Sequence, residues 1–336
     1  MSVDNELRLL PLELASYQHH PLHATERTWT ETNCYVDLWI EVLHALGLEP
    51  MAAAAFTLST DFEGDQWTFF KFPPEDLRAV FGLEVAELNV WRPVLDHVVD
   101  QMEMGRLVTM EADSWFLPDT RGVSYQIAHG KSTIVPNSVD RSGRRLAYFH
   151  NAGYFELEGD DFDGLFHLRA YAAPTALPPY VETVRLDRMR RGDPDLVTRA
   201  VELTKAHLAR RPINDPMARF EQRLQHDLEW LGSQDIETFH LYAFGTCRQC
   251  GATAELAGSF VEWLAHHDGA RSGSGDGDDL TYVAGQFRAV ATAAKALQFA
   301  LARLSRGRTV DLHGTFEEMS RAYELAMAGL EAHYGR

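Results

Sequence analysis

Cysteine is scarce in this chain, whose 336 residues contain only three. Three cysteines cannot all pair with one another, so a disulfide framework is not expected and a reducing cytoplasm is the simplest location. No apolar run approaches the roughly 20 residues of a membrane-spanning helix. The first residues, MSVDNELRLLPLE, lack the basic and apolar regions of a secretion signal. We therefore expect a cytoplasmic protein that does not enter a membrane.

Positive charge is also in short supply, with 31 Lys and Arg against 49 Asp and Glu and a net charge of −18. This balance argues against general binding to nucleic acid or to an anionic membrane surface. The phosphate-binding pattern GxxxxGK[ST] is absent, so ATP use is not expected. The pair CRQC at 247–250 has metal-ligand spacing, but no second cysteine pair completes a zinc site. We predict buried structural thiols there, with no metal and no bound cofactor.

The two halves of the sequence have different periodicities. Residues 1–175 contain short β-like segments, including 64–72, with a few helices between them. Three prolines in 173–180 predict a domain boundary. From residue 181 onward, apolar residues recur every three or four positions, as in helices. We predict an α+β domain over 1–175 and an all-α helical domain over 176–336.

The first cysteine stands at the start of a predicted helix within RTWTETNCYVDLWIEVLHALGLEP, residues 27–50. Backbone N–H groups in a first turn have no helical partner, so they favour a thiolate and a lower cysteine pKa. The same amides, with the Asn33 side chain, could hold a developing oxyanion. We predict that Cys34 is a nucleophile; the alternative is a cysteine that only packs in the interior.

A nucleophilic cysteine needs a base and a group that orients the base. His129 is placed at the start of a predicted strand, and the returning strand ends at His150 and Asn151. Paired strands would bring His129 and Asn151 together, and the order helix Cys, strand His, strand Asn is that of papain-like enzymes. His150 is the alternative base. Asp140 is the alternative orienting residue, although Asp in a turn commonly bonds its own backbone.

Two acidic residues, Glu111 and Asp113, alternate along a predicted strand and could receive a substrate ammonium group. The alternative is a solvated or ion-paired strand end. His19, His20 and His23 lie close together near the N-terminus, where we expect them to face solvent.

Several segments resemble a bacterial family known only as a domain of unknown function, whose genes tend to occur beside small carrier proteins and ligases that load amino acids onto them. The resemblance runs nearly the full length of the chain. More distantly, the layout resembles the acyltransferase of butirosin biosynthesis, which joins a papain-like part to a helical part and moves an acyl group from a carrier-protein thioester to an amine. The segments that carry the family resemblance are TNCYVDLWIEVLHALGLEP, GRLVTMEADSWFLPDT, HGKSTIVPNSVD, YFHNAGYFEL and FHLYAFGTCRQCGATAEL.

These resemblances imply a papain-like domain followed by a helical domain, and an acyl, more specifically aminoacyl, transferase. Cys34 would take the acyl group from the phosphopantetheine arm of a carrier protein and pass it to a small-molecule or carrier acceptor. The basic residues Arg188, Arg190 and Arg191 could dock the carrier; the alternative is a solvated basic run. Two other functions remain open: a cysteine hydrolase or peptidase-like enzyme, and a carrier-binding protein without catalysis.

Overall fold

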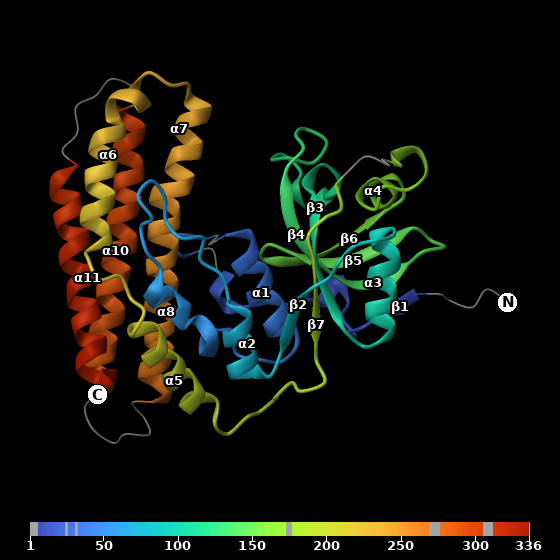
Figure 1. Ribbon diagram of the computed structural model, residues 1–336, viewed down its shortest axis with the longest axis horizontal. Coiled ribbons are helices and arrows are strands. Elements are labelled where there is room, and N and C mark those ends of the chain that lie inside the picture. The colour runs from blue at the N-terminus through green and yellow to red at the C-terminus, as the bar shows by residue number, and fades with distance from the viewer. Residues whose placement is uncertain are drawn as a thin grey trace. The chain divides into compact units, whose positions relative to one another are not determined.

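The computed structural model describes residues 6–23, 26–30, 33–172, 177–268, 276–304 and 312–335 (Figure 1). The chain forms two compact units, and each unit is built from three segments that are not continuous in sequence. The first comprises Met1–His23, Cys34–Pro50 and Pro73–Gly192, and the second comprises Ala24–Asn33, Met51–Phe72 and Asp193–Arg336.

An antiparallel sheet forms the centre of the first unit. Its strands follow the order β2-β7-β3-β4-β5-β6, and β1 pairs with the far end of β4. Every neighbouring pair is antiparallel. The strands are β1 (Glu6–Arg8), β2 (Glu84–Glu87), β3 (Leu107–Asp113), β4 (Lys131–Asp140), β5 (Arg145–His150), β6 (Gly153–Glu158) and β7 (Val181–Arg185).

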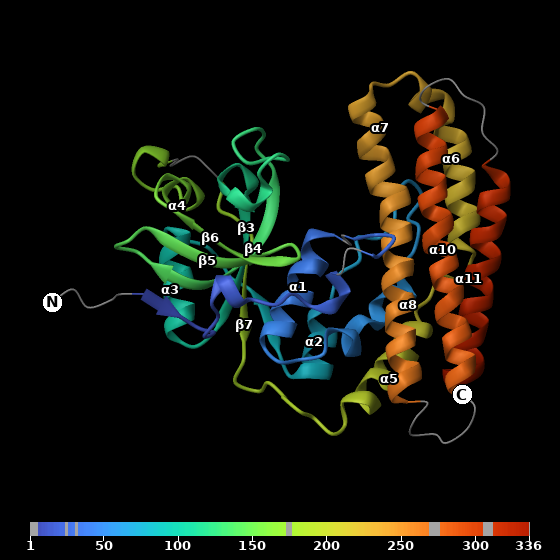
Figure 2. The ribbon, with the colours of Figure 1, turned by 180° about the vertical axis from the view of Figure 1, so that it is seen from behind.

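Helices cover both faces of this sheet. Val181 of β7 packs in a core cluster with α3 (Val94–Glu103) and α4 (Asp160–Leu165). The next residue, Glu182, accepts a hydrogen bond from Tyr35 of α1 (Cys34–Ala45). Successive strand residues point to opposite faces, so α1 and α3 cover opposite faces of the sheet. Helix α1 lies against β4, β5 and β6 (Figure 2), and α2 (Pro74–Phe81) lies against β2.

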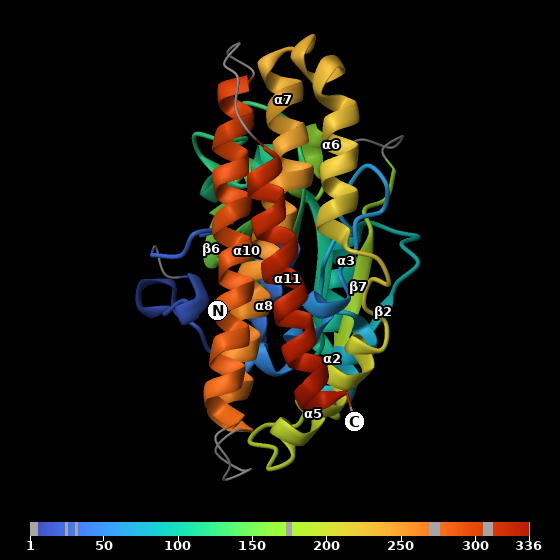
Figure 3. The ribbon, with the colours of Figure 1, turned by 90° about the vertical axis from the view of Figure 1, so that its left-hand side faces the viewer.

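The second unit is a bundle of helices, as the periodicity predicts. Its long helix α10 packs against α8 on one side and α11 on the other, and α11 also contacts α6 (Figure 3). The helices are α5 (Leu196–Leu208), α6 (Pro216–Gly232), α7 (Ile236–Ala243), α8 (Gln249–His267), α10 (Asp276–Leu304) and α11 (His313–Tyr334). A π-helical turn, Phe244–Arg248, connects α7 to α8. In the part of the chain that the structure covers, no helix combines the length and apolarity needed to cross a membrane.

The predicted class, a mixed domain with a sheet followed by an all-helical region, is confirmed at this level, but two segments differ from prediction. Residues 64–72 contain no strand; one isolated bridge joins Phe62 to Trp67, whose side chains pack on Phe220 instead. Residues 181–185 form strand β7 and not a helix, because β2 and β3 supply pairing partners on both sides. Thus the proline-rich segment 173–180 precedes a central strand of the first unit.

Candidate functional site

Cys34 is the first residue of α1, and its side chain is partly exposed. Burial is the largest influence on its pKa and raises it, and the negative charge of Asp37 raises it further. The backbone N–H groups of Tyr35 and Cys34, together with the Ser132 hydroxyl, act in the opposite direction. The net pKa lies above the ordinary value of 9.0, so the expectation of a lowered pKa is wrong. Burial and one carboxylate outweigh the helix terminus, and Cys34 rests as a thiol at neutral pH.

A hydrogen-bonded chain leads from Ser132 into the protein interior. The Ser132 Oγ lies 2.6 Å from His150 Nε2, and His150 Nδ1 lies 2.5 Å from Asp119 Oδ2. The Tyr148 hydroxyl donates to the other Asp119 oxygen at 2.6 Å. The Ser132 hydroxyl also acts to lower the pKa of the Cys34 thiol, so the thiol lies near the serine end of this series of hydroxyl, imidazole and carboxylate.

The strand register explains why these side chains meet. His150 of β5 pairs with Ile134 of β4, and Ser132 lies two residues before Ile134 on the same face. Diagonal neighbours of this kind are within reach of a histidine ring. Tyr148 lies two residues before His150, so both side chains point to the same face and reach Asp119. Asp119 is held in a 3-10 turn, Pro118–Thr120, that begins with proline.

Exposure decreases along this chain of groups. The Cys34 side chain is partly exposed, whereas Ser132 retains 9% of its accessible surface and His150 retains 1%. The Asp119 side chain is 4% exposed. Cys34 is therefore the most exposed residue of the set, while the imidazole and its carboxylate are shielded from water. This is the arrangement expected of a nucleophile activated by a buried, fixed base.

His129, the predicted base, lies in a different environment. It falls in the loop before β4, and its side chain is 69% exposed. Its Nδ1 lies 2.6 Å from Asp113 Oδ2, and its ring stacks on Trp115 at 4.5 Å between centroids. Asp113 also accepts from the backbone N–H groups of Trp115 and Gly130. His129 and Asp113 thus form a separate pair, and His150 occupies the place assigned to His129.

Asn151 and Asp140 both serve turns. Asn151 follows the last residue of β5 with a φ of 45°, in the two-residue connection before Gly153 pairs back with His150. Asn tolerates this left-handed conformation, so the turn accounts for the residue. Asp140 accepts from Gly143 N at 2.7 Å, which lowers its pKa. The contact predicted between His129 and Asn151 is found instead between His150 and Asp119.

The predicted oxyanion donor Asn33 is directed elsewhere. Its side-chain nitrogen donates to the Phe70 carbonyl at 2.9 Å, and the residue is 2% exposed. Thr32, the other polar residue just before Cys34 that could cap this helix, lies outside the described residues. The backbone N–H groups of Cys34 and Tyr35, with the Ser132 hydroxyl, are the groups that act to lower the pKa of the thiol.

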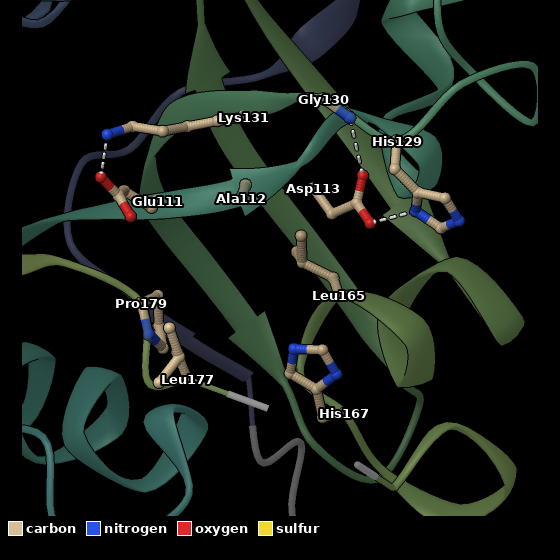
Figure 4. A pocket seen from close by; sticks show the side chains of 10 residues that line it. All are labelled: Glu111, Ala112, Asp113, His129, Gly130, Lys131, Leu165, His167, Leu177 and Pro179. Carbon is tan, nitrogen blue, oxygen red and sulfur yellow. Dashed lines mark hydrogen bonds and ion pairs between the residues drawn. The ribbon is translucent and has the colours of Figure 1, made fainter. Parts of the chain in front are cut away.

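A pocket of about 380 Å³ lies at the ends of β3 and β4 and includes Glu111 and Asp113 (Figure 4). The Lys131 ammonium group forms an ion pair with Glu111. In Figure 4, Leu165 and His167 stand opposite the strand ends, and Pro179 lies beside Leu177. Both predicted substrate-binding carboxylates therefore line one pocket, and each already has a cationic or ionisable partner.

The His23 side chain is buried, whereas we expected it to face solvent. Its side chain is 3% exposed, and its ring contacts Glu41 through Nδ1 and Asp37 through Nε2. The Tyr17 hydroxyl and the His20 backbone N–H also donate to Glu41. We call Tyr17, His23, Asp37 and Glu41 the α1 network, because it fixes the N-terminal segment onto the helix that begins at Cys34.

The predicted docking arginines have unequal surroundings. Arg190 donates to the carbonyls of Arg78 and Ala79 at the end of α2, and Arg191 donates to the Leu46 carbonyl after α1. Cationic side chains at these positions cap helix ends and interact favourably with the helix dipole. Arg188 is exposed. Two of the three arginines thus have structural contacts.

Cys247 and Cys250 are both buried, as predicted, and neither is disulfide-bonded. Burial raises the pKa of Cys247 to about 12 and that of Cys250 well above its ordinary value. Among the described residues, no group of three or more His, Cys, Asp or Glu side chains could hold a metal ion. Burial therefore keeps both thiols protonated at neutral pH.

Ser132 and Asp119 are the site residues that sequence reasoning missed. The sequence did contain an indication for His150, which ends the apolar strand segment LAYFH. A polar residue buried with such a strand needs a hydrogen-bond partner, because burying it without one costs free energy. Asp119 follows a proline in FLPDT and looks like an ordinary turn residue. Its role depends on packing between segments distant in sequence.

Two family models match this chain and together span most of it. The DUF1839 N-terminal domain matches residues 18–186, and the DUF1839 C-terminal domain matches residues 193–332. The chain therefore belongs to the DUF1839 family. No curated protein is similar to it in sequence.

Proposed function

We propose that this DUF1839 protein is a cysteine-dependent acyltransferase with a papain-like arrangement of its catalytic groups. Cys34 is the nucleophile, His150 is the base, Asp119 orients the base, and Ser132 connects the sulfur to the imidazole. The observation that carries the proposal is the buried Ser132–His150–Asp119 series of hydrogen bonds, together with the effect of the Ser132 hydroxyl on the pKa of a partly exposed cysteine. A cysteine at a helix start and a His–Asp pair at the end of an antiparallel strand support the papain-like assignment.

The raised pKa of Cys34 favours proton removal during the reaction over a preformed thiolate. Ser132 has one hydroxyl proton, which it donates to His150 Nε2 while Nδ1–H donates to Asp119. As the sulfur attacks, its proton passes to Ser132 Oγ and the Ser132 proton passes to Nε2. Asp119 then stabilises the imidazolium, and the thiolate accepts a hydrogen bond from Ser132. Acyl transfer to the sulfur returns the proton to the leaving thiol.

We propose a carrier-protein thioester as the donor and an aminoacyl group as the cargo. Exchange of one thioester for another is nearly isoenergetic, so neither a nucleotide nor a metal is required by the chemistry. The carboxylates of Glu111 and Asp113 in one pocket support an acyl group or acceptor that carries an amine. Arg188 is the exposed cation left for docking an acidic carrier, since Arg190 and Arg191 bond helix carbonyls.

A serine hydrolase is the second candidate, because Ser132, His150 and Asp119 also have the spacing of a serine triad. The smaller exposure of Ser132 than of Cys34 favours the cysteine as nucleophile. In the serine reading, the covalent adduct forms on Ser132 and water is the acceptor. A third candidate, a carrier-binding protein without catalysis, predicts tight binding and no adduct.

Intact-mass spectrometry with a glycyl thioester, first on a carrier protein and then on N-acetylcysteamine, tests these candidates. The acyltransferase predicts a mass gain of one glycyl group, mapped to Cys34 by peptide mass analysis and absent from Cys34→Ala. Ser132→Ala should still acquire the adduct, but roughly 10²-fold more slowly, because the proton path is interrupted. An adduct on Ser132 would establish the serine hydrolase. A wild-type protein that binds the carrier but never gains mass would contradict the catalytic proposal.

A further inference from the structure

We infer that the pocket at the ends of β3 and β4 binds a primary amine as acyl acceptor, and that the His129–Asp113 pair removes a proton from it. This inference rests on the proposed function. It assigns the His129–Asp113 pair to the removal of a proton from the acceptor amine, a step for which the Cys34 site has no accessible base. His150 is 1% exposed and both its ring nitrogens have partners, so it cannot meet an acceptor arriving from solvent.

The His129–Asp113 pair has the geometry of a fixed base. Asp113 Oδ2 lies 2.6 Å from His129 Nδ1, and Asp113 Oδ1 accepts from Trp115 N at 3.0 Å and from Gly130 N at 3.3 Å. The ring of His129 lies 12° from parallel with that of Trp115. With Nδ1 holding the proton for Asp113, Nε2 is an acceptor, and no hydrogen-bond partner for it occurs among the described residues. Figure 4 shows the contacts of Asp113 with His129 and Gly130.

The pocket charge favours a cationic guest. Its charged lining consists of Glu111, Asp113 and Lys131, which gives one excess negative charge when the histidines are neutral. Glu111 and Lys131 form an ion pair and offset each other, so the negative charge of Asp113 is the one that can attract a cationic guest. An amine arrives at neutral pH as an ammonium ion, which this field attracts and which must lose a proton before it can attack. Leu165, Leu177 and Pro179 offer apolar surface to the rest of the guest.

The pocket adjoins the strand position of Ser132, a member of the proposed reaction centre. Ala112 lines it and is the direct strand partner of Ser132. Directly paired residues have side chains on the same face about 5 Å apart. Lys131, another lining residue, precedes Ser132 in the chain. The pocket lining therefore includes both the cross-strand partner and the chain neighbour of Ser132.

The transfer step balances as follows. The ammonium group loses one proton to His129 Nε2, and Asp113 stabilises the resulting imidazolium. The amine lone pair attacks the thioester carbonyl carbon, a carbon–nitrogen bond forms and the carbon–sulfur bond breaks. The second proton lost by the nitrogen passes to the departing Cys34 sulfur. The products are an amide and the free thiol, and His129 releases its proton to water.

The test measures how the glycyl enzyme divides between amide and free acid when n-butylamine is the acceptor probe. We expect saturable amide formation in the wild type. The amide-to-acid ratio should fall at least tenfold in His129→Gln and in Asp113→Asn, because both variants lose the base but not the Cys34 site. His313→Gln is the matched control, since it removes an equally exposed histidine that contacts Glu221 in the helical unit. Unchanged ratios in both pocket variants, or amide formation that rises linearly without saturation, would overturn the inference.

A binding measurement separates this inference from the proposed function. NMR of the histidine rings in Cys34→Ala protein follows n-butylamine without any acyl chemistry. Saturable shifts of the His129 signals, lost in Asp113→Asn and not produced by n-butanol, support the amine site whatever the fate of the Cys34 proposal. Absence of a saturable His129 shift would refute the amine site even if Cys34 is acylated.

Discussion

Individual side chains set the reactivity of Cys34 more than the position of the residue at a helix start. Burial raises its pKa, Asp37 raises it further, and two backbone N–H groups with Ser132 lower it by less. The helix terminus contributes a fraction of a charge, whereas Asp37 contributes a full one. A helix-start cysteine is therefore a thiol here, and its activation depends on a base.

Replacing Asp37 by Asn should make Cys34 more reactive. The amide keeps the size of the side chain but removes the negative charge that opposes the thiolate, so the pKa of Cys34 falls. Alkylation by iodoacetamide at pH 7.5 should accelerate roughly two- to tenfold, because one pKa unit changes the thiolate fraction about tenfold. Cys247 and Cys250 are buried and should not contribute.

The matched control is Asp195→Asn, which removes one charge from an exposed position at the start of α5. It should leave the alkylation rate unchanged. Equal rates in Asp37→Asn and the wild type would show that the Asp37 charge does not act on the thiol.

The sequence predicted the proposed nucleophile, Cys34, and named His150 only as an alternative base. Cys34 could be identified because a helix start and a rare residue type are local features. His150 was recognised only as an alternative base, because His129 and His150 both lie near the predicted strand pair. Only the strand register shows that His150 is the one beside Ser132. Asp119 and Ser132 could not be assigned, since a turn aspartate and a strand serine acquire their roles from neighbours brought in by the fold.

At the scale of elements, the α1 network makes stability depend on pH. Burial lowers the pKa of His23, but hydrogen bonds and charge from Asp37 and Glu41 outweigh it, and the pKa is raised. Burial raises the pKa of Glu41, but His23, Tyr17 and the His20 N–H outweigh it, and the pKa is lowered. A histidine with a raised pKa stabilises the fold below its unfolded value of about 6.5, and this contribution is lost as pH rises through the folded value.

The free energy of unfolding should therefore decline between about pH 6.5 and the raised pKa of His23. Glu41 acts in the opposite sense: its contribution is present above its unfolded value of about 4.5 and is lost as pH falls through the lowered one. Urea titrations of His23→Gln should show a smaller decline on the alkaline side than the wild type. His240→Gln, at an exposed position, should retain the wild-type profile. Identical profiles for His23→Gln and the wild type would refute this role of the network.

At the scale of the whole chain, the segment before Cys34 is part of the helical unit. The backbone N–H groups of Thr28 and Trp29 each donate to the Glu255 carboxylate at 2.9 Å, and Trp29 Nε1 donates to the Ala291 carbonyl. The Trp29 indole lies against Gly251 of α8. Gly251 and Glu255 of the motif CRQCGATAE thus hold this segment against the helical unit.

Gly251→Ala should destabilise the helical unit. An added Cβ would lie 2.3 Å from a Trp29 ring atom, so either the ring or the helix must shift. Overpacking of this kind costs about 1–3 kcal/mol, which should lower the calorimetric midpoint by several degrees. Gly285→Ala in α10 is the matched control, since nothing lies within 4 Å of its added Cβ and Ala favours a helix. A Gly251→Ala midpoint equal to that of Gly285→Ala would contradict this packing.

The helical half was predictable because each helix carries its own periodicity and length. The helical prediction was wrong for β7, whose five residues pair with strands β2 and β3, more than 70 residues earlier in the chain. The strand prediction for the aromatic segment 64–72 was also wrong. Its composition is typical of a strand, but Trp67 and the neighbouring Phe62 pack on Phe220 of helix α6. Tertiary packing outweighs local preference in both cases.

The central claim is that Cys34 accepts an acyl group with His150 as its base, and the most direct measurement is the single-turnover acylation rate. Rapid quenching with a glycyl thioester of N-acetylcysteamine, read by intact mass, compares the wild type with His150→Gln and His129→Gln. The account predicts a rate lowered by roughly 10²- to 10⁴-fold in His150→Gln and changed by less than about twofold in His129→Gln. A slow His129→Gln beside an unaffected His150→Gln would contradict it.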